Sequence, residues 1–177
     1  MSFSYGERHI LEGVCLNFEP GKTYAIVGEN GSGKSTLINL ITGLLVPSRG
    51  NVFFDGINIH NNLEQFRSHI GYVPQDTMLL NESIESNITF CRNAVSEHAL
   101  EEVLHICEVD VIMKTNSMSI DTVIGEKGNK LSGGQKQKIA LSRALYRKPK
   151  LLIIDEGTSN IDSDTCLLYT SPSPRDS

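Results

Sequence analysis

Two short glycine-rich stretches carry residue types that can bind and transform phosphate groups. The first runs from Gly28 to Thr36 and reads Gly-Glu-Asn-Gly-Ser-Gly-Lys-Ser-Thr. Glycines let backbone N–H groups turn toward anionic oxygens, while the lysine can reach terminal phosphates and the first hydroxyl can hold Mg²⁺. We therefore expect nucleotide phosphates to be bound by this loop, through Gly28, Asn30, Gly31, Ser32, Gly33, Lys34, Ser35 and Thr36.

The elements around this loop must place it correctly. Thr23–Val27 is short and apolar, which predicts a buried strand. Ser35–Leu45 has Leu37, Leu40 and Leu44 at helical spacing, which predicts a helix with one apolar face. A strand, a glycine loop and a helix in that order are the context that a phosphate loop needs, because the helix dipole also favours anions.

A second candidate group follows an aliphatic run. Residues 151–154 read Leu-Leu-Ile-Ile and are followed by Asp155 and Glu156. Such a run predicts a central parallel strand, whose carboxyl end is where open α/β sheets place ligands. Asp155 there can hold Mg²⁺ through its water shell, and Glu156 can activate an attacking water. The alternative is a strand that ends in two solvated acids.

The second glycine-rich stretch, Leu131–Gln135, reads Leu-Ser-Gly-Gly-Gln and predicts a helix start with Ser132 as N-cap. Each glycine in a helix costs about 1 kcal/mol relative to alanine, so a close backbone approach to a ligand would explain the pair. A flexible helix start is the alternative. We expect the cations that follow to form a solvated basic face: Lys136, Lys138, Arg143, Arg147 and Lys148.

In this order, these motifs resemble the nucleotide-binding domain of ATP-binding cassette (ABC) transporters, over about residues 2–164. The match looks like the Walker A loop, a Q-loop at Gln75, the signature at Leu131–Gln135, a Walker B strand ending at Asp155 and the catalytic Glu156. Ser159–Asp162 resembles the D-loop. The resemblance implies ATP and Mg²⁺ as ligands, with Mg²⁺ contacts from Ser35, Gln75 and Asp155.

The resemblance also implies partners. Two such domains sandwich two ATP molecules head to tail, so that one signature contacts the γ-phosphate held by the other domain. This assigns nucleotide contacts to Ser132, Gly133, Gly134 and Gln135. Tyr5 resembles the aromatic residue that stacks on adenine, although a tyrosine packed at the domain edge is the alternative. Gln75 would sense the transmembrane domains and contact Mg²⁺ or the catalytic water.

Exporters are favoured over importers by two stretches. Thr122–Gly128 resembles the exporter X-loop, and Asn81–Ile88 resembles the exporter stretch after the Q-loop. In the family these segments face the coupling helices of the membrane domains. The implied function is ATP hydrolysis that powers export, at the cytoplasmic face of the cell membrane. A soluble ABC ATPase of DNA repair or translation is the second hypothesis.

The end of the chain departs from the family pattern. Gly157 stands where proline is usual, and all five histidines precede the Walker B strand, so none matches the switch histidine. The run Cys166–Ser177 resembles a translated transposon-end sequencing adapter, and we expect the natural sequence to stop near Thr165. Met1 also falls inside a predicted strand. A truncated chain of this kind is expected to hydrolyse ATP weakly or to be an inactive ATP-binding fragment.

We therefore predict an α/β fold: a P-loop NTPase core with a parallel sheet, an antiparallel edge subdomain, an inserted helical subdomain over about 76–130, and an incomplete C-terminus. The predicted domain is 1–165, and 166–177 is a non-native tail. Edge strands are expected at Val14–Phe18 and in a hairpin over Asn51–Ile59. The net charge of −5 gives no sign of a nucleic-acid surface, and with no apolar run of about 18 residues, membrane attachment is expected through a partner.

Overall fold

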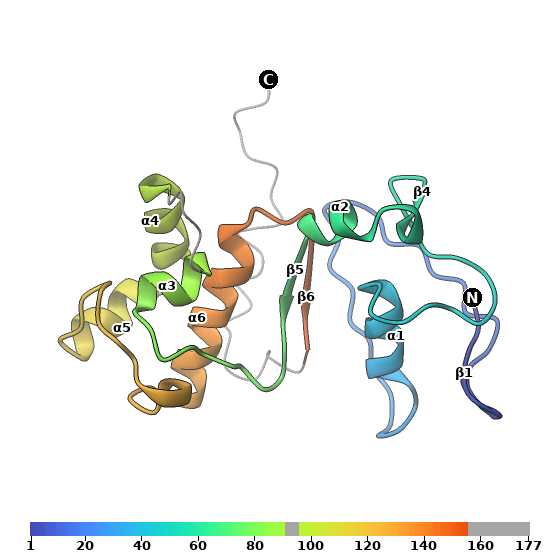
Figure 1. The fold of residues 1–177 in the computed structure, drawn as a ribbon, viewed down its shortest axis with the longest axis horizontal. Coiled ribbons are helices and arrows are strands. Elements are labelled where there is room, and N and C mark those ends of the chain that lie inside the picture. Colours follow the sequence, from blue (N-terminus) through green and yellow to red (C-terminus); the bar gives the residue numbers. More distant parts are fainter. Residues whose placement is uncertain (91–95, 156–177) are drawn as a thin grey trace. The chain divides into compact units, whose positions relative to one another are not determined.

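A computed structural model describes residues 1–90 and 96–155 of the 177-residue chain (Figure 1). It is a mixed α/β structure with one parallel strand pair and two antiparallel pairs, as the sequence predicted. The chain divides into two compact units, one over Met1–Ser68 and one that begins at His69. The expectations for Glu156, Gly157, Ser159–Asp162 and Cys166–Ser177 lie outside the described residues.

The first unit contains two antiparallel hairpins and two short α-helices. Its elements are β1 (Phe3–Tyr5), β2 (Arg8–Leu11), α1 (Lys34–Ile41), β3 (Phe53–Phe54), β4 (Ile57–Asn58), the 3₁₀ helix η1 (Ile59–Asn61) and α2 (Leu63–Ser68). In the second hairpin, Asp55 and Gly56 both have positive φ, 50° and 76°, as a tight two-residue turn requires. The paired part is shorter than predicted, because Ile59 already begins η1.

The predicted strands at Thr23–Val27 and Val14–Phe18 are wrong. Among the described residues neither segment pairs with a strand, and Val27 is 87% exposed. The chain between them instead makes a local turn: Lys22 N donates to Glu19 O at 3.4 Å, and the Tyr24 hydroxyl accepts from Glu19 N at 3.0 Å. A strand needs a neighbour to satisfy its backbone groups, and apolar composition does not supply one.

Helix α1 is also shorter than predicted, and it ends at Ile41 rather than near Leu45. Gly43 adopts φ 69°, and the N–H groups of Leu44 and Leu45 donate back to Asn39 O at 2.8 and 3.0 Å. A glycine with positive φ is a common helix stop. Leu37 and Leu40 are buried as predicted, whereas Leu44 lies beyond the stop and is exposed.

In residues 69–90 and 96–155, the second unit contains one parallel strand pair and four α-helices. Its elements are β5 (Ile70–Val73), α3 (Ile84–Thr89), α4 (Glu97–Ile106), α5 (Val109–Thr115), the 3₁₀ helix η2 (Glu126–Gly128), α6 (Gly133–Tyr146) and β6 (Leu151–Ile154). Strands β5 and β6 pair in parallel from Ile70–Leu151 to Val73–Ile154. Helix α6 contacts β5 and also packs against α3, α4 and α5 (Figure 1).

The core of this unit follows from the apolar faces of its helices. Ser96 caps α4 by accepting from Ala99 N, as predicted, and Leu100, Val103 and Cys107 are buried. They belong to the same hydrophobic core as the buried residues of α6, which are Ile139, Ala140, Leu141, Ala144, Leu145 and Tyr146. The helices therefore hold α6 in place, and α6 carries the glycine pair at its start.

Candidate nucleotide site

The first candidate site is the glycine loop before α1. Lys34 folds back over the loop, and its Nζ donates to Gly28 O at 2.7 Å and to Glu29 O at 2.8 Å. Gly31 and Gly33 have φ values of 82° and 94°, which favour glycine. The loop is thus a closed turn, and the Lys34 ammonium group bonds to two of its carbonyls.

The loop fits a polyphosphate. Its last glycine, Gly33, is the N-cap of α1, so the N–H groups of the first helical turn have no partner inside the helix. A cation and a helix N-terminus at one loop are a common anion-binding arrangement. A Cβ on Gly28 would lie 2.8 Å from Ser32 Oγ, and one on Gly33 would lie 3.1 Å from Ile10 and Leu11 side chains. A side chain at Gly33 would therefore be both strained and crowded, whereas one at Gly28 would require only that the Ser32 hydroxyl move.

Tyr5 lies at the end of β1, and its side chain is 52% exposed. Its ring meets Phe3 edge to face, with centroids 4.8 Å apart. Part of Tyr5 therefore remains accessible to a ligand. This is compatible with stacking on a base, which stays a prediction.

The second unit brings two of the predicted metal contacts to one sheet edge. Gln75 and Asp155 both follow the carboxyl ends of β5 and β6, which are neighbours in parallel register. Asp155 N donates to Val73 O at 2.9 Å, so the ladder continues to the acid itself. Amide and carboxylate oxygens are ligands that suit Mg²⁺. Ser35, the third predicted contact, belongs to the first unit.

Tyr72 is a neighbour of Asp155 that the sequence pattern did not reveal. Its hydroxyl donates to Asp155 Oδ2 at 3.2 Å. Burial, together with the Asp155 carboxylate, raises the pKa of Tyr72 above its ordinary value, so the hydroxyl stays protonated. Only the β5–β6 register shows this contact, because the two residues are far apart in sequence.

The third candidate site is the start of α6. Ser132 is its N-cap, and its Oγ accepts from Gln135 N at 3.3 Å while Gln135 Oε1 accepts from Ser132 N at 2.9 Å. This capping box fixes the loop that enters the helix. Adding a Cβ at Gly133 would meet nothing within 4 Å, so the glycine leaves open space at the helix N-terminus.

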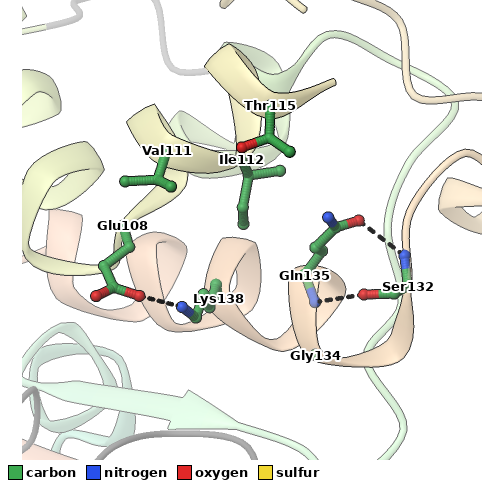
Figure 2. Close-up of a pocket in the computed structure, with 8 residues that line it drawn as sticks. All are labelled: Glu108, Val111, Ile112, Thr115, Ser132, Gly134, Gln135 and Lys138. Carbon is green, nitrogen blue, oxygen red and sulfur yellow. Dashed lines mark hydrogen bonds and ion pairs between the residues drawn. The ribbon is translucent and has the colours of Figure 1, made fainter. Parts of the chain in front are cut away.

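A cavity of about 340 Å³ lies beside this helix start, between α5 and α6 (Figure 2). Val111, Ile112 and Thr115 line it from α5, and an ion pair between Lys138 and Glu108 closes one side. The Ser132–Gln135 capping box lies at the other side. Glu108 has a φ of 54° and stands between α4 and α5, so this pair ties three helices together.

The solvated basic face predicted after the signature is wrong for two of its five cations. Lys138 pairs with Glu108, and Arg143 donates three hydrogen bonds to Met78 and Asn87. Helical spacing predicts which side of a helix a cation occupies. It does not predict which acceptors a neighbouring segment brings to that side.

Comparison with known proteins decides the family. Residues 11–159 match the family described as "ABC transporter", which is most of the chain. The chain belongs to the ABC transporter family. The stretches that resemble the Walker A loop, the Q-loop and the signature all lie within the matched residues.

Individual relatives of this ABC cassette agree. It is 41% identical over 170 residues to "ATP-binding cassette sub-family B member 5" of Homo sapiens, covering 93% of this chain and 13% of that protein. It is 36% identical over 167 residues to "Uncharacterized ABC transporter ATP-binding protein YwjA" of Bacillus subtilis (strain 168), covering 93% and 29%. The chain thus spans less than a third of either relative.

A solved structure also matches the cassette. It is described as "Structure of a bacterial Atm1-family ABC exporter with ATP bound" and aligns with a TM-score of 0.82 and 34% identity. The alignment covers 96% of this chain and 30% of the exporter chain. In residues 1–90 and 96–155 of the cassette, no helix is long and apolar enough to span a membrane.

Proposed function

We propose that this cassette is the ATP-hydrolysing motor domain of an export-type ABC transporter. The observation that carries the proposal is the pairing of two elements in one chain. The same chain carries both a phosphate loop closed by Lys34 and a signature helix capped by Ser132, and it is similar to an ABC exporter of known structure. The substrate that is exported stays open.

Nucleotide binding is assigned to the loop from Gly28 to Thr36. Lys34 would exchange its contacts with the Gly28 and Glu29 carbonyls for phosphate oxygens, which are stronger acceptors because they are charged. Loop and first-turn N–H groups of α1 would bind the remaining oxygens, and Tyr5 would stack on the base. Bound ATP with Mg²⁺ supplies the phosphoanhydride bond that is broken.

Metal binding and hydrolysis are assigned to oxygen-bearing side chains. Ser35, Gln75 and Asp155 would hold Mg²⁺, with Tyr72 orienting the Asp155 carboxylate through its hydroxyl. Glu156 would accept a proton from the attacking water. The protein's part is to position these groups, because phosphoryl transfer depends mainly on alignment and on charge stabilisation.

The signature of this domain is assigned to the nucleotide site of a partner domain. Ser132, Gly133, Gly134 and Gln135 would contact the γ-phosphate held by a partner domain in a head-to-tail pair. The N-cap and capping box support this assignment, because they hold the helix N-terminus in a fixed and open arrangement. Transmembrane domains would attach the pair to the cytoplasmic face of the cell membrane.

The test uses the parent transporter purified in lipid. Glu156→Gln should keep ATP binding and ATP-dependent pairing of the cassettes while phosphate release falls by orders of magnitude. Glu101→Gln, a change of the same type on the exposed side of α4, is the control and should hydrolyse ATP normally. Unchanged turnover in Glu156→Gln would remove its assignment as base, and a wild-type parent without ATPase activity would overturn the proposed function.

A further inference from the structure

Arg143 of α6 joins the signature helix to the segment that follows Gln75. Its Nε donates to Asn87 O at 2.7 Å, and its Nη2 donates to Asn87 Oδ1 at 3.1 Å. Its Nη1 donates to Met78 O at 3.0 Å, and the guanidinium lies over the Phe90 ring, 5.2 Å from the centroid. One side chain therefore contacts the start, the middle and the end of residues 78–90.

Asn87 connects the loop before α3 to the helix itself by hydrogen bonds. It is fully buried on α3, where its Oδ1 accepts from Leu80 N at 2.8 Å. Its Nδ2 donates to Leu80 O at 3.1 Å and to Ser83 O at 3.0 Å. The loop before α3 is thus folded onto the helix through one amide, and Arg143 holds that amide in turn.

Arg143 is half-buried, and the oxygens that it contacts are uncharged amide oxygens, which offset the cost of burying a cation less than a carboxylate would. Burial lowers the pKa of Arg143 from its ordinary value, consistent with this cost. A planar fork of donors is favoured where two separate backbone segments must keep a fixed spacing.

The same segment is also attached to the chain that enters the signature. Ile84 N donates to Thr122 O at 3.2 Å, and Ile124 N donates to Glu82 O at 3.1 Å. An antiparallel bridge joins Ser83 to Val123. Residues 78–90 are therefore tied on both sides of Ser132: through residues 122–124 before it and through Arg143 after it.

We propose that Arg143 is a positioning residue that locks residues 78–90 to the signature helix, so that the signature follows the movement of the segment after Gln75. The distance over which this lock acts is short: Ser132 and Arg143 are eleven helical steps apart, or about 16.5 Å at the rise of an α-helix. This inference rests on the proposed function for its effect on hydrolysis. The structural part of the inference, that Arg143 fixes residues 78–90 to α6, does not depend on the proposed function.

The test compares Arg143→Gln and Arg143→Lys in the parent transporter, with Arg147→Gln as control. Arg147 is exposed at the end of the same helix. Lysine keeps the charge and can reach one carbonyl, but it cannot span Met78 O and Asn87 O together. We expect at least about five-fold faster amide exchange over 78–90 in both Arg143 variants, with α4 unchanged.

Turnover gives a second readout. Counted per nucleotide-binding site, kcat should fall about ten-fold in Arg143→Gln and less in Arg143→Lys, with the KM for ATP within two-fold of wild type. A merely structural role would lower Tm and speed exchange over 78–90 but leave kcat per site unchanged, and that result would overturn the inference. If Arg143→Gln does not fold, Arg143→Lys decides by the same two measurements.

The two proposals fail separately. A wild-type parent without ATPase activity contradicts the motor function, whereas amide exchange still tests the lock. An active parent in which Arg143→Lys keeps wild-type exchange and wild-type kcat contradicts the lock alone. Changes in Arg147→Gln as large as those in Arg143→Gln would also count against it, since they would show a general effect of charge on α6.

Discussion

Ser132 and Gln135 hold each other in place at the start of α6: each backbone N–H donates to the other's side chain, at 2.9 and 3.3 Å. One pair therefore both begins the helix and shapes the surface assigned to a partner's γ-phosphate. These two roles can be separated, because helix capping and phosphate contact depend on different properties of residue 132.

Replacing Ser132 with alanine removes the cap and should lower the free energy of unfolding by about 1 kcal/mol. Urea unfolding followed by circular dichroism measures this. Ser96→Ala removes the equivalent cap of α4 and should cost a similar amount. ATP turnover per folded site should fall only in Ser132→Ala, and an equal fall in both variants would contradict a role of Ser132 at the nucleotide.

Ser132→Asp should separate the two roles further. Aspartate is a good N-cap and should keep the stability of the helix. Its charge repels a γ-phosphate, so ATP turnover should fall by at least about ten-fold in the paired transporter. Wild-type turnover in Ser132→Asp would show that this surface does not meet a phosphate.

Lys34→Met should weaken ATP binding by about ten- to a hundred-fold, because a hydrogen bond to a charged group contributes about 1.5–3 kcal/mol. Lys22→Met, an exposed lysine in the same unit, is the control. Isothermal titration with ATP and Mg²⁺ measures both. Equal affinity in the two variants would place the phosphates away from Lys34.

Gly33→Ala should destabilise the first unit by more than strain at a positive φ alone, which costs about 1–2 kcal/mol. The added Cβ would lie 3.1 Å from Ile10 Cγ2 and from Leu11 Cδ2. Gly6→Ala has a φ of 59° and open space, so it reports the strain without the contact. Chemical unfolding compares the two, and a smaller loss at Gly33 would mean that β2 moves aside freely.

Cys107 should make stability fall at high pH. Burial raises the pKa of its thiol to about 11. The unfolded thiol ionises near pH 9, so the contribution to stability is complete below pH 9 and is lost as the pH rises from 9 to 11. Cys107→Ala should remove this slope in urea titrations between those values, whereas Cys15→Ala, at an exposed cysteine, should keep it.

Local signals in the sequence predicted local structure well. The caps at Ser132 and Ser96 and the Asp55–Gly56 turn depend on a few neighbouring residues, and the structure confirms them. The family and the α/β class followed from motif order, which the comparisons confirm. The roles assigned to individual site residues stay predictions.

The predictions that were wrong or missed concern residues whose contacts depend on segments distant in sequence. Thr23–Val27 has strand composition but no strand beside it among the described residues. Arg143 has the spacing of a surface cation, yet its acceptors are 56 and 65 residues away. Tyr72 meets Asp155 only because of the β5–β6 register. No local pattern carries this information.

Two stretches of the second unit that are far apart in sequence meet at one backbone carbonyl. His69 O accepts from the N–H groups of both Lys150 and Leu151, at 2.9 and 3.1 Å. The 80 residues between them therefore form a loop that is closed at its base. Because one carbonyl holds both ends of this loop, the loop begins where β5 starts and ends where β6 starts, so the parallel register of the two strands that precede Gln75 and Asp155 is set at His69 O.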